Sequence, residues 1–488
     1  MQNEAFSALS YAMGKGYQIH PDAFTLLQDL ETDPLRAVQE IIKLKGKAAT
    51  VILLEDVKNF IGSPDEINFT MEQSCKVLLD PTTATNTAEG VDGYSRLFRS
   101  RFEKTLKIIS QRPDSKRITK IESVKHTLRD GKPAFGNAEE RAGNGNAVMV
   151  AGLLLSRRTR KMGIELEIDD YTGIIRAVAT TEELKRQVAN LAIDQAVMVE
   201  LEYGKGLRGP IIKTVMSPDI PERMRGKSKS ESYAVLISDL HVGSKHFMRD
   251  AFLRFIQWLS SENDIARKIR FLCVGGDIID GVGIFPNQDA ELTELDTAKQ
   301  MEAATGLLSM VPKHIKMLVI PGNHDPGRRA LPQPSIPVVR SEGLRRLENC
   351  MMLGNPAVVD LNGVKVLMYH GQSLDDVIAA TPGMSYGKPA LAMKIFLKAR
   401  HLAPTYGGKT PIAPELEDMM VISEVPDVLH SGHVHVTDIE NYRGTLIVNS
   451  GAWQSRTKFQ QTMGIIPSPG FAVLVNLATL QPTLIDFN

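Results

Sequence analysis

Acidic, amide and histidine side chains recur in five short fragments in the second half of this 488-residue chain. The fragments read Ser-Asp-Leu-His (238–241), Gly-Gly-Asp (275–277), Gly-Asn-His-Asp (322–325), Tyr-His-Gly (369–371) and Gly-His-Val-His (432–435). They offer oxygen and imidazole nitrogen donors and no thiolate, a set that suits manganese, iron or zinc. Two such ions roughly 3.5–4 Å apart can clamp a phosphate ester and activate a bridging water. The fragments therefore predict a two-metal site that acts on phosphate esters.

Each fragment follows a short apolar run of the kind that forms a buried strand. The runs are 233–238, 271–275, 317–320, 364–369 and 427–430. In layered α/β folds, ligands gather beyond the carboxyl ends of the strands. A single His or Asp at a strand end is usually a cap or a satisfied polar group. The prediction of a metal site therefore rests on all five fragments occurring in order, each after an apolar run.

The order of the fragments resembles that of the calcineurin-like metallophosphoesterases. Further stretches are similar to the family of small, exonuclease subunits of archaeal DNA polymerase D, namely 321–329, 369–378, 400–407, 410–415 and 449–454. The resemblance covers residues 145–488 and extends only loosely to the N-terminal part. Related B subunits of eukaryotic replicative polymerases have lost the metal ligands, whereas this chain has all of them. The resemblance therefore favours an active site that is still functional.

The resemblance implies seven metal ligands and two divalent ions, with Mn²⁺ expected and iron or zinc as alternatives. One metal would be held by Asp239, His241 and His435, the other by Asn323, His370 and His433, and Asp277 would bridge the two.

Four residues next to these ligands are expected to handle the substrate. His324 follows a metal-ligand Asn, so it is expected to contact the phosphate or to protonate the leaving oxygen. Asp325 is expected to fix the tautomer of His324; a turn cap is the alternative for this carboxylate. Arg328 and Arg329 are candidates for contacts with the DNA backbone, and a surface-loop role is the alternative.

The bulk composition limits the remaining possibilities. The length of 488 residues predicts two or three domains, and the hydrophobic content of 43% is ample for a core. The formal net charge is zero, so any nucleic-acid-binding surface must be local. Cys75, Cys273 and Cys350 lie far apart, which suits a reducing compartment and predicts a cytoplasmic protein. We expect neither a secretion signal nor a membrane span, because no apolar run approaches 18 residues.

The N-terminal part has two expected segments. Residues 1–60 show helical spacing of apolar residues and predict a small helical domain. Residues 61–140 predict a linker that contains a basic helical segment. The cations of that segment include Arg96, Arg99, Arg101, Lys104, Lys107, Arg112, Lys116 and Arg117. Such an excess can gather phosphates; the alternative is a solvated helix face whose apolar side packs on the body.

Residues 141–220 change to short apolar or alternating runs separated by turn residues. The succession of strands, with a helix near 181–191, predicts an OB-fold barrel. Only Tyr171 and Tyr203 could stack bases, so a docking or scaffolding role is favoured over binding of single strands. Residues 221–488 are expected to form the phosphoesterase domain. The predicted fold class is therefore α/β: a calcineurin-like phosphoesterase β-sandwich flanked by helices, preceded by an OB-fold barrel and a small helical N-terminal domain.

The C-terminal residues 481–488 carry a pattern with two interpretations. It resembles a sliding-clamp binding motif but lacks the second aromatic residue. It is also typical of a closing β-strand, which is the favoured interpretation.

Taken with the resemblance, these features predict the small subunit of a replicative DNA polymerase with metal-dependent 3′–5′ exonuclease (proofreading) activity. Its expected partners are a large catalytic polymerase subunit and a DNA 3′ end, with the sliding clamp as a further candidate. A structural scaffold subunit with little or no nuclease activity is one alternative. A free-standing phosphodiesterase is the other, although such an enzyme has no need of the barrel and the basic segment.

Overall fold

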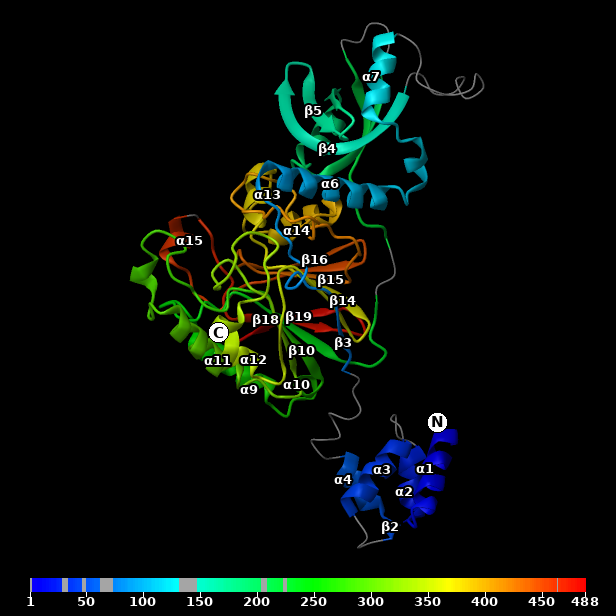
Figure 1. Cartoon of the computed structure of the whole chain (residues 1–488). Coiled ribbons are helices and arrows are strands. Elements are labelled where there is room, and N and C mark those ends of the chain that lie inside the picture. Colours follow the sequence, from blue (N-terminus) through cyan, green and yellow to red (C-terminus); the bar gives the residue numbers. More distant parts are fainter. Residues whose placement is uncertain are drawn as a thin grey trace. The chain divides into compact units, whose positions relative to one another are not determined.

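The computed structural model describes residues 2–28, 34–45, 50–61, 73–130, 147–202, 209–222, 226–462 and 464–488 (Figure 1). The chain divides into two compact units, Met1–Gln73 and Ser74–Asn488. Each unit has its own hydrophobic core, and each is described by itself.

The first unit is helical in its described residues. Its helices are α1 (Gln2–Gly14), α2 (Pro21–Gln28), α3 (Pro34–Lys45) and α4 (Leu54–Ile61), and β1 (Gln18–Ile19) pairs in parallel with β2 (Val51–Ile52). Ala12, Leu27, Val38 and Val57 pack together, one from each helix. The expected helical character is thus confirmed, and α4 adds a helix that the sequence pattern did not indicate.

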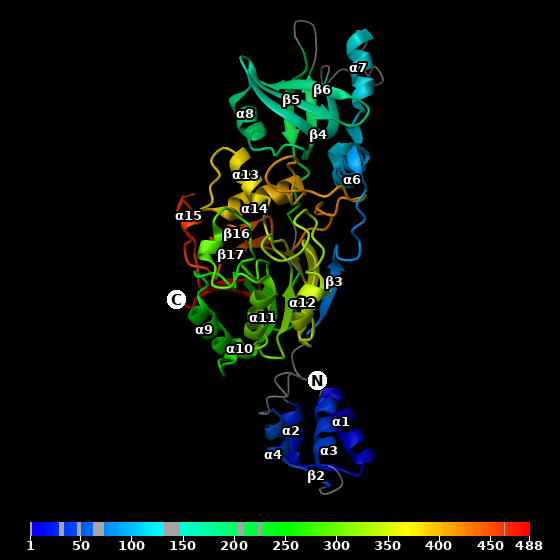
Figure 2. The ribbon, with the colours of Figure 1, turned by 60° about the vertical axis from the view of Figure 1, so that its left-hand side comes forward.

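The second unit contains a closed barrel. Its strands are β4 (Ala147–Arg160), β5 (Gly163–Asp169), β6 (Ile174–Ala179), β7 (Ala196–Glu202) and β8 (Ile211–Met216), in the order β4-β5-β6-β8-β7. Helix α8 (Glu182–Ala189) lies between β6 and β7 in the chain. This strand order and helix position are those of an OB-fold. Helix α7 (Ile121–Asp130) adds Ile121 and Val124 to the barrel core (Figure 2).

The expected linker at 61–140 holds more structure than its composition indicated. Strand β3 (Cys75–Leu79) pairs antiparallel with β13 (Ala357–Leu361) at the edge of a sheet. An edge strand is only half buried, so β3 lacks the continuous apolar run that marks a buried strand. Helix α6 (Gly90–Ile109) is the predicted basic helix, and its apolar side packs on barrel residues such as Met149 and Met198. Residues 62–72 and 131–140 lie outside the described ranges.

Within the described residues, the remaining strands form two six-stranded sheets. The first has the order β12 (Cys350–Met352), β11 (Lys316–Val319), β10 (Ile269–Val274), β9 (Tyr233–Ile237), β18 (Phe471–Asn476) and β19 (Pro482–Asp486). The second has the order β16 (Thr437–Tyr442), β17 (Thr445–Ser450), β15 (Val428–Ser431), β14 (Val364–Met368), β13 and β3. All five predicted strand runs before the metal-ligand fragments are therefore confirmed.

The two sheets pack face to face, and helices cover their outer faces. Leu236 and Phe271 of one sheet meet Val366 and Val448 of the other in the inner core. The first sheet is covered by α9 (Arg249–Leu259), α11 (Thr297–Leu308) and α12 (Val338–Arg345), and the second by α13 (Leu374–Ala380) and α14 (Pro389–Ala399). This is the predicted α/β class, a β-sandwich flanked by helices.

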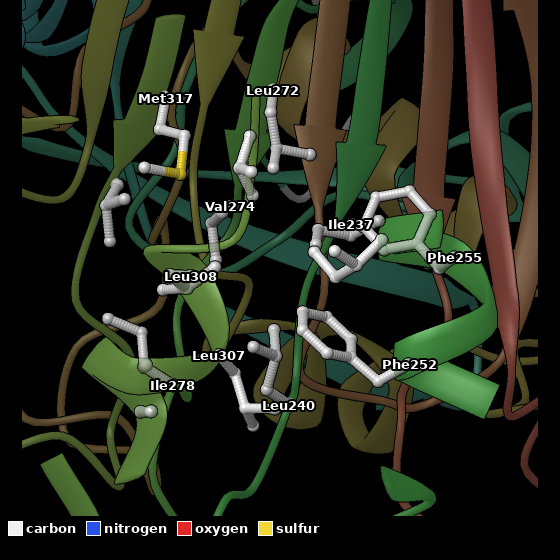
Figure 3. Packing of buried hydrophobic residues seen from close by; sticks show 14 of the residues in the cluster. Ile237, Leu240, Phe252, Phe255, Leu272, Val274, Ile278, Leu307, Leu308 and Met317 are labelled. Atoms are coloured by element: carbon white, nitrogen blue, oxygen red, sulfur yellow. The ribbon is translucent and has the colours of Figure 1, made fainter. Parts of the chain in front are cut away.

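The outer helices dock through apolar side chains spaced one turn apart. In α9, Phe252 and Phe255 point at the sheet beside Ile237 and Leu272 (Figure 3). Their spacing of three residues puts both rings on one helix face, which fixes the helix against the strands that end at the site.

The C-terminal residues form the strand that was favoured over a clamp motif. Strand β19 pairs antiparallel with β18, and Phe487 is buried against Phe255 and Trp258. The described part of the chain contains no helix long and apolar enough to cross a membrane.

Candidate metal centre

The predicted ligands lie at the ends of strands from both sheets. Strands β9, β10 and β11 run parallel and end at Ile237, Val274 and Val319, and β14 and β15 run parallel in the facing sheet. The chain turns sharply after these strands. Five of the predicted ligand residues adopt positive φ angles, namely Asp239 (54°), His241 (53°), Asp277 (51°), His433 (71°) and His435 (60°). Such conformations cost on the order of 1–3 kcal/mol each and cluster at functional sites.

One donor group consists of Asp239, His241 and His435. His241 Nε2 lies 3.0 Å from His435 Nε2, and His435 Nε2 lies 3.4 Å from Asp239 Oδ1. His241 Nδ1 donates to Asp280 Oδ1 at 2.8 Å, so Nε2 is the ring nitrogen that faces the other donors. Two ring nitrogens and a carboxylate oxygen thus converge on one point.

The second donor group surrounds His370. Its Nε2 lies 3.0 Å from Asn323 Oδ1 and 3.3 Å from Asp277 Oδ2. His370 Nδ1 donates to the carbonyl oxygen of Gly275 at 2.8 Å, so Nε2 is again the ring nitrogen that faces the other donors. Asp239, Asp277 and His370 also form a donor group of their own, which links the two clusters through buried carboxylates.

His433 stands beside these groups with a different partner. Its backbone N–H donates to both oxygens of Asp239, at 3.1 and 2.9 Å. Its ring lies 5.3 Å from the His370 ring, and its Nε2 lies 3.6 Å from Asp375 Oδ2. The structure therefore places His433 at the site, with its ring nitrogen facing Asp375.

The buried carboxylates give the site negative charge. Burial alone would raise the pKa of Asp239 and Asp277, but the neighbouring histidines outweigh it and hold both pKa values below the usual range. Burial also opposes ionisation of Asp280, and His241 lowers its pKa nevertheless. Three charged carboxylates, with imidazole nitrogens facing one another, form a donor set that fits divalent cations. The residues present therefore suit a metal centre.

His324 and Asp325 have separate partners. His324 Nδ1 donates to the carbonyl oxygen of Asp280 at 2.7 Å, and burial lowers the pKa of its ring to about 4, with Asp277 partly opposing. The Asp325 carboxylate instead accepts from the backbone N–H groups of Ile278, Ile279 and Gly322 at 3.0, 3.2 and 2.9 Å. Those bonds are the turn-capping alternative for Asp325, and the tautomer of His324 is held by Asp280.

The two arginines after the site differ in surroundings. Arg328 pairs with Glu415 at 2.6 Å and also donates to Thr87 and to the carbonyl of Pro332. Its guanidinium therefore joins three segments of the fold. Arg329 has an exposed side chain, and its backbone oxygen accepts from Gln372.

Part of the basic segment also has structural partners. Arg101 is 1% exposed and pairs with Asp418, and Lys104 pairs with Glu417 at 2.6 Å. Arg112 donates to the carbonyl of Ser217. These three cations tie α6 and the residues after it to the body, which neither interpretation of the basic segment expected. The apolar side of α6 packs on the barrel, as the alternative to phosphate gathering expected. Tyr171 packs on Phe102 of α6, and Tyr203 lies outside the described residues.

Three residues at the site were not anticipated from the sequence. Asp280 holds both His241 and His324, and Gln288 donates to its carbonyl and carboxylate at 2.8 and 3.1 Å. Gln460 places its side-chain amide 2.7 Å from His435 Nδ1. The fragment Gly-Asp-Ile-Ile-Asp offered a signal for Asp280, three residues after Asp277. Neither glutamine stands in a recognisable motif.

The site opens into a pocket of about 300 Å³. The predicted ligands that line it are His241, Asp277, Asn323, His433 and His435, and other lining residues include Tyr386, Lys409, Phe285 and Phe459. A phosphate ester that entered this pocket would meet the converging donors and the ring of His324.

The comparisons with known proteins agree with the sequence resemblance. Residues 234–436 match the family model that describes the B subunit of DNA polymerases alpha and epsilon. The chain is 39% identical over 409 residues to the DNA polymerase II small subunit of Pyrococcus furiosus, covering 82% of this chain and 64% of that protein. It is 32% identical over 494 residues to the corresponding protein of Methanothermobacter thermautotrophicus, covering 97% of this chain and 98% of that protein.

Solved structures also align with this chain. A novel archaeal phosphodiesterase aligns with 52% of this chain and 98% of its own, at 13% identity and a TM-score of 0.27. The wild-type Vps29 of Entamoeba histolytica in complex with zinc aligns with 52% of this chain and 99% of its own, at 13% identity and a TM-score of 0.25.

The DNA polymerase II small subunits of Pyrococcus furiosus and Pyrococcus horikoshii are longer than this chain. The chain spans 64% of the first and 63% of the second. The match to Methanothermobacter thermautotrophicus runs over nearly the whole length of both sequences. On this sequence similarity, the chain belongs to the family of small subunits of archaeal DNA polymerase II, the polymerase D family.

Proposed function

We propose that this chain is a metal-dependent 3′–5′ exonuclease that removes nucleotides from a DNA end for an associated polymerase. The observation that carries the proposal is the gathering of donor residues from five strand ends: Asp239, His241 and His435 form one donor group, Asp239, Asp277 and His370 form another, and five of the seven predicted ligands line one pocket. A scaffold subunit without activity would have no need of that donor set, nor of the hydrogen bonds that orient it. The proposal assigns two divalent ions to the site, with Mn²⁺ as the expected metal.

The proposed ligands divide as the two donor groups suggest. Asp239, His241 and His435 would hold one ion, and Asn323 and His370 the other, with Asp277 shared. His433 belongs to the second set by resemblance, and a ring rotation away from Asp375 would bring it there. When bound, the ions would offset the charge of the phosphate and make a water molecule more acidic.

The chain's own residues would then orient and protonate the substrate. His324 has its Nδ1 fixed by the carbonyl of Asp280, so its Nε2 is the atom available to the departing sugar oxygen. Burial favours the neutral ring, so donation from Nε2 would require the imidazolium form, which the negative charge of a bound phosphate would favour. Arg329, exposed beside the site, is our candidate for a contact with the DNA backbone. Arg328 is less suited to such a contact, because its guanidinium already pairs with Glu415.

A large catalytic polymerase subunit is the proposed partner, because membership in this family implies one. A sliding-clamp contact through residues 481–488 is not part of the proposal, because β19 is paired in the sheet and Phe487 is buried.

The decisive experiment combines metal analysis with DNA digestion. We expect the protein to bind divalent metal and to shorten 3′-end-labelled and 5′-end-labelled single strands from their 3′ ends in Mn²⁺. Asp277→Asn, which keeps the side-chain shape but removes the shared charge, should abolish metal binding and cleavage. Asp250→Asn, at an exposed position in the first turn of α9, is the matched control. Full cleavage by the Asp277 variant, or in the presence of chelator, would refute the metal mechanism.

A further inference from the structure

Two aromatic side chains stand at the wall of the metal pocket and have no role in holding the donors. Phe285 and Phe459 stack on each other, with ring centroids 5.5 Å apart and planes inclined by 26°. Both line the pocket that contains the ligands, and Phe459 is 50% exposed. A half-exposed ring at the wall of this pocket leaves an apolar face that no described side chain covers completely.

The segments that carry these rings are fixed to the site by hydrogen bonds. Phe459 lies in α15 (Lys458–Thr462), and the next residue, Gln460, contacts Nδ1 of the ligand His435 at 2.7 Å. On the other side, the backbone N–H of Ile284 donates to Gln288 at 2.9 Å, and Gln288 donates to Asp280. Each ring is therefore one residue away from a hydrogen-bonded link to the metal site. The aromatic pair holds a defined position relative to the donors.

We infer that Phe285 and Phe459 form a stacking platform for the unpaired base at the end of the DNA strand, a role that rests on the proposed function. Every base has a π-face, so an aromatic ring can hold any base without reading its identity. A phosphate at the donors would carry its nucleoside toward a wall of the same pocket. The pocket of about 300 Å³ has the size of a small-molecule site, which suits a single nucleotide better than a base pair with its backbone. The platform would thus select ends whose terminal base has left the duplex.

The inference is tested by binding without cleavage. The probe is a single-stranded oligonucleotide with 2-aminopurine as its 3′-terminal base, mixed with the full chain in Ca²⁺ or chelator. Stacking on an aromatic ring quenches 2-aminopurine fluorescence. We expect quenching by the wild type and its loss in Phe459→Ala and Phe285→Ala, with binding weakened about 5–100-fold. Phe459→Trp, which keeps an aromatic ring at this position, should retain both the quenching and the affinity of the wild type.

Two controls separate stacking from damage to the fold. Phe6→Ala removes another half-exposed ring that pairs with an aromatic neighbour, Phe24, outside the second unit, and should change neither signal. An oligonucleotide with an abasic 3′ terminus should bind the wild type and both alanine variants alike. Metal content of the variants should equal that of the wild type.

The outcomes distinguish the platform from the exonuclease itself. If the alanine variants quench and bind as the wild type does, the platform is refuted while the proposed function stands. If they lose affinity for the abasic oligonucleotide equally, the rings support the fold and the platform is again refuted. If the wild type cleaves no DNA end, the proposed function fails, and the fluorescence result alone decides whether the rings bind a base.

Discussion

At the residue scale, His324 could serve either as a metal ligand or as a proton donor, and the two roles can be distinguished by experiment. It forms a donor group with His241 and Asp280, and its ring lies 4.7 Å from that of His241. Geometry alone would allow a ligand role. Its position after Asn323 and its Nδ1 bond to the Asp280 carbonyl favour proton transfer through Nε2.

We predict that His324→Ala binds two metal ions as the wild type does but cleaves DNA on the order of 10²–10⁴ times more slowly, the usual contribution of a positioned acid. The defect should shrink on a nitrophenyl phosphodiester, whose leaving group needs no proton. Metal analysis and kinetics on both substrates provide the measurement. A fall in metal content would make His324 a ligand instead.

Asp280 allows a second prediction at this scale. Its Oδ1 accepts from His241 Nδ1, and Gln454 donates to the same oxygen at 3.0 Å. Asp280→Asn weakens the partner that orients His241, so metal affinity should fall about 10–100-fold, as is typical when such a partner is removed. Titration with Mn²⁺ measures this, and Asp289→Asn at an exposed position of the same loop is the control. Equal affinity in the two variants would mean that His241 needs no such support.

At the element scale, helix α6 is held by a buried ionic cluster. Arg101 Nε donates to Asp418 Oδ2 at 2.9 Å, and both side chains are 1% exposed. His401 Nε2 donates to the same oxygen at 2.9 Å, while its Nδ1 accepts from the backbone N–H of Ala403. The histidine is therefore neutral in the folded protein. The cluster joins α6 to the loop segments around residues 401 and 418.

Removal of one charged partner of this cluster should lower the free energy of unfolding, because the other charge is then left unpaired in the interior. We predict that Asp418→Asn lowers the free energy of unfolding by about 3–5 kcal/mol in denaturant titrations. The double variant Arg101→Met with Asp418→Leu should recover most of this loss. Glu342→Gln, which breaks the exposed pair with Arg346, is the control and should cost about 1 kcal/mol or less. A loss no larger than that of the control would mean that the cluster does not stabilise the fold.

The same cluster predicts a pH dependence. Burial lowers the pKa of His401 to about 4, against about 6.5 in an unfolded chain. Between these values the unfolded chain binds one more proton than the folded one, so stability falls as the pH falls from 6.5 to 4. Asp418, whose pKa is held low by His401 and Arg101 against burial, adds a loss only below about pH 4. We expect His401→Gln to reduce the slope of stability against pH by one proton in that window. An unchanged slope would show that His401 is not neutral when folded.

Much of the architecture followed from buried strands. The runs 233–238 and 271–275 predicted β9 and β10 to within two residues, because a strand covered on both faces is apolar at every position. Strand β3 and helix α4 were not predicted. Strand β3 alternates between intermediate and exposed positions, so it lacks a continuous apolar run, and α4 is a short helix of eight residues. The candidate ligands could be picked out because each follows a buried strand. Asp280 was signalled only by the fragment Gly-Asp-Ile-Ile-Asp, and Gln460 not at all, because its contact with His435 arises from tertiary placement.

At the scale of the whole molecule, the boundary between the two units lies at residues 73 and 74. The expected division at 140 would cut through the second unit. It would remove β3 from its sheet, α6 with Arg101, and α7 with the two side chains that it adds to the barrel core. The region needed for association with a large subunit is therefore expected to begin at residue 74.

We predict that a chain of residues 74–488 folds, binds metal as the full chain does, and co-purifies with the large polymerase subunit. A chain beginning near residue 140 should be strongly destabilised, because it exposes the edge of β13, leaves Asp418 without Arg101 and uncovers Leu154 and Ile168 of the barrel. Co-expression with the large subunit, followed by affinity purification and thermal unfolding, measures both properties. Association of residues 1–73 alone would move the interface to the helical unit. Wild-type stability in the chain that begins at 140 would show that β3, α6 and α7 are accessory to the second unit rather than part of its fold.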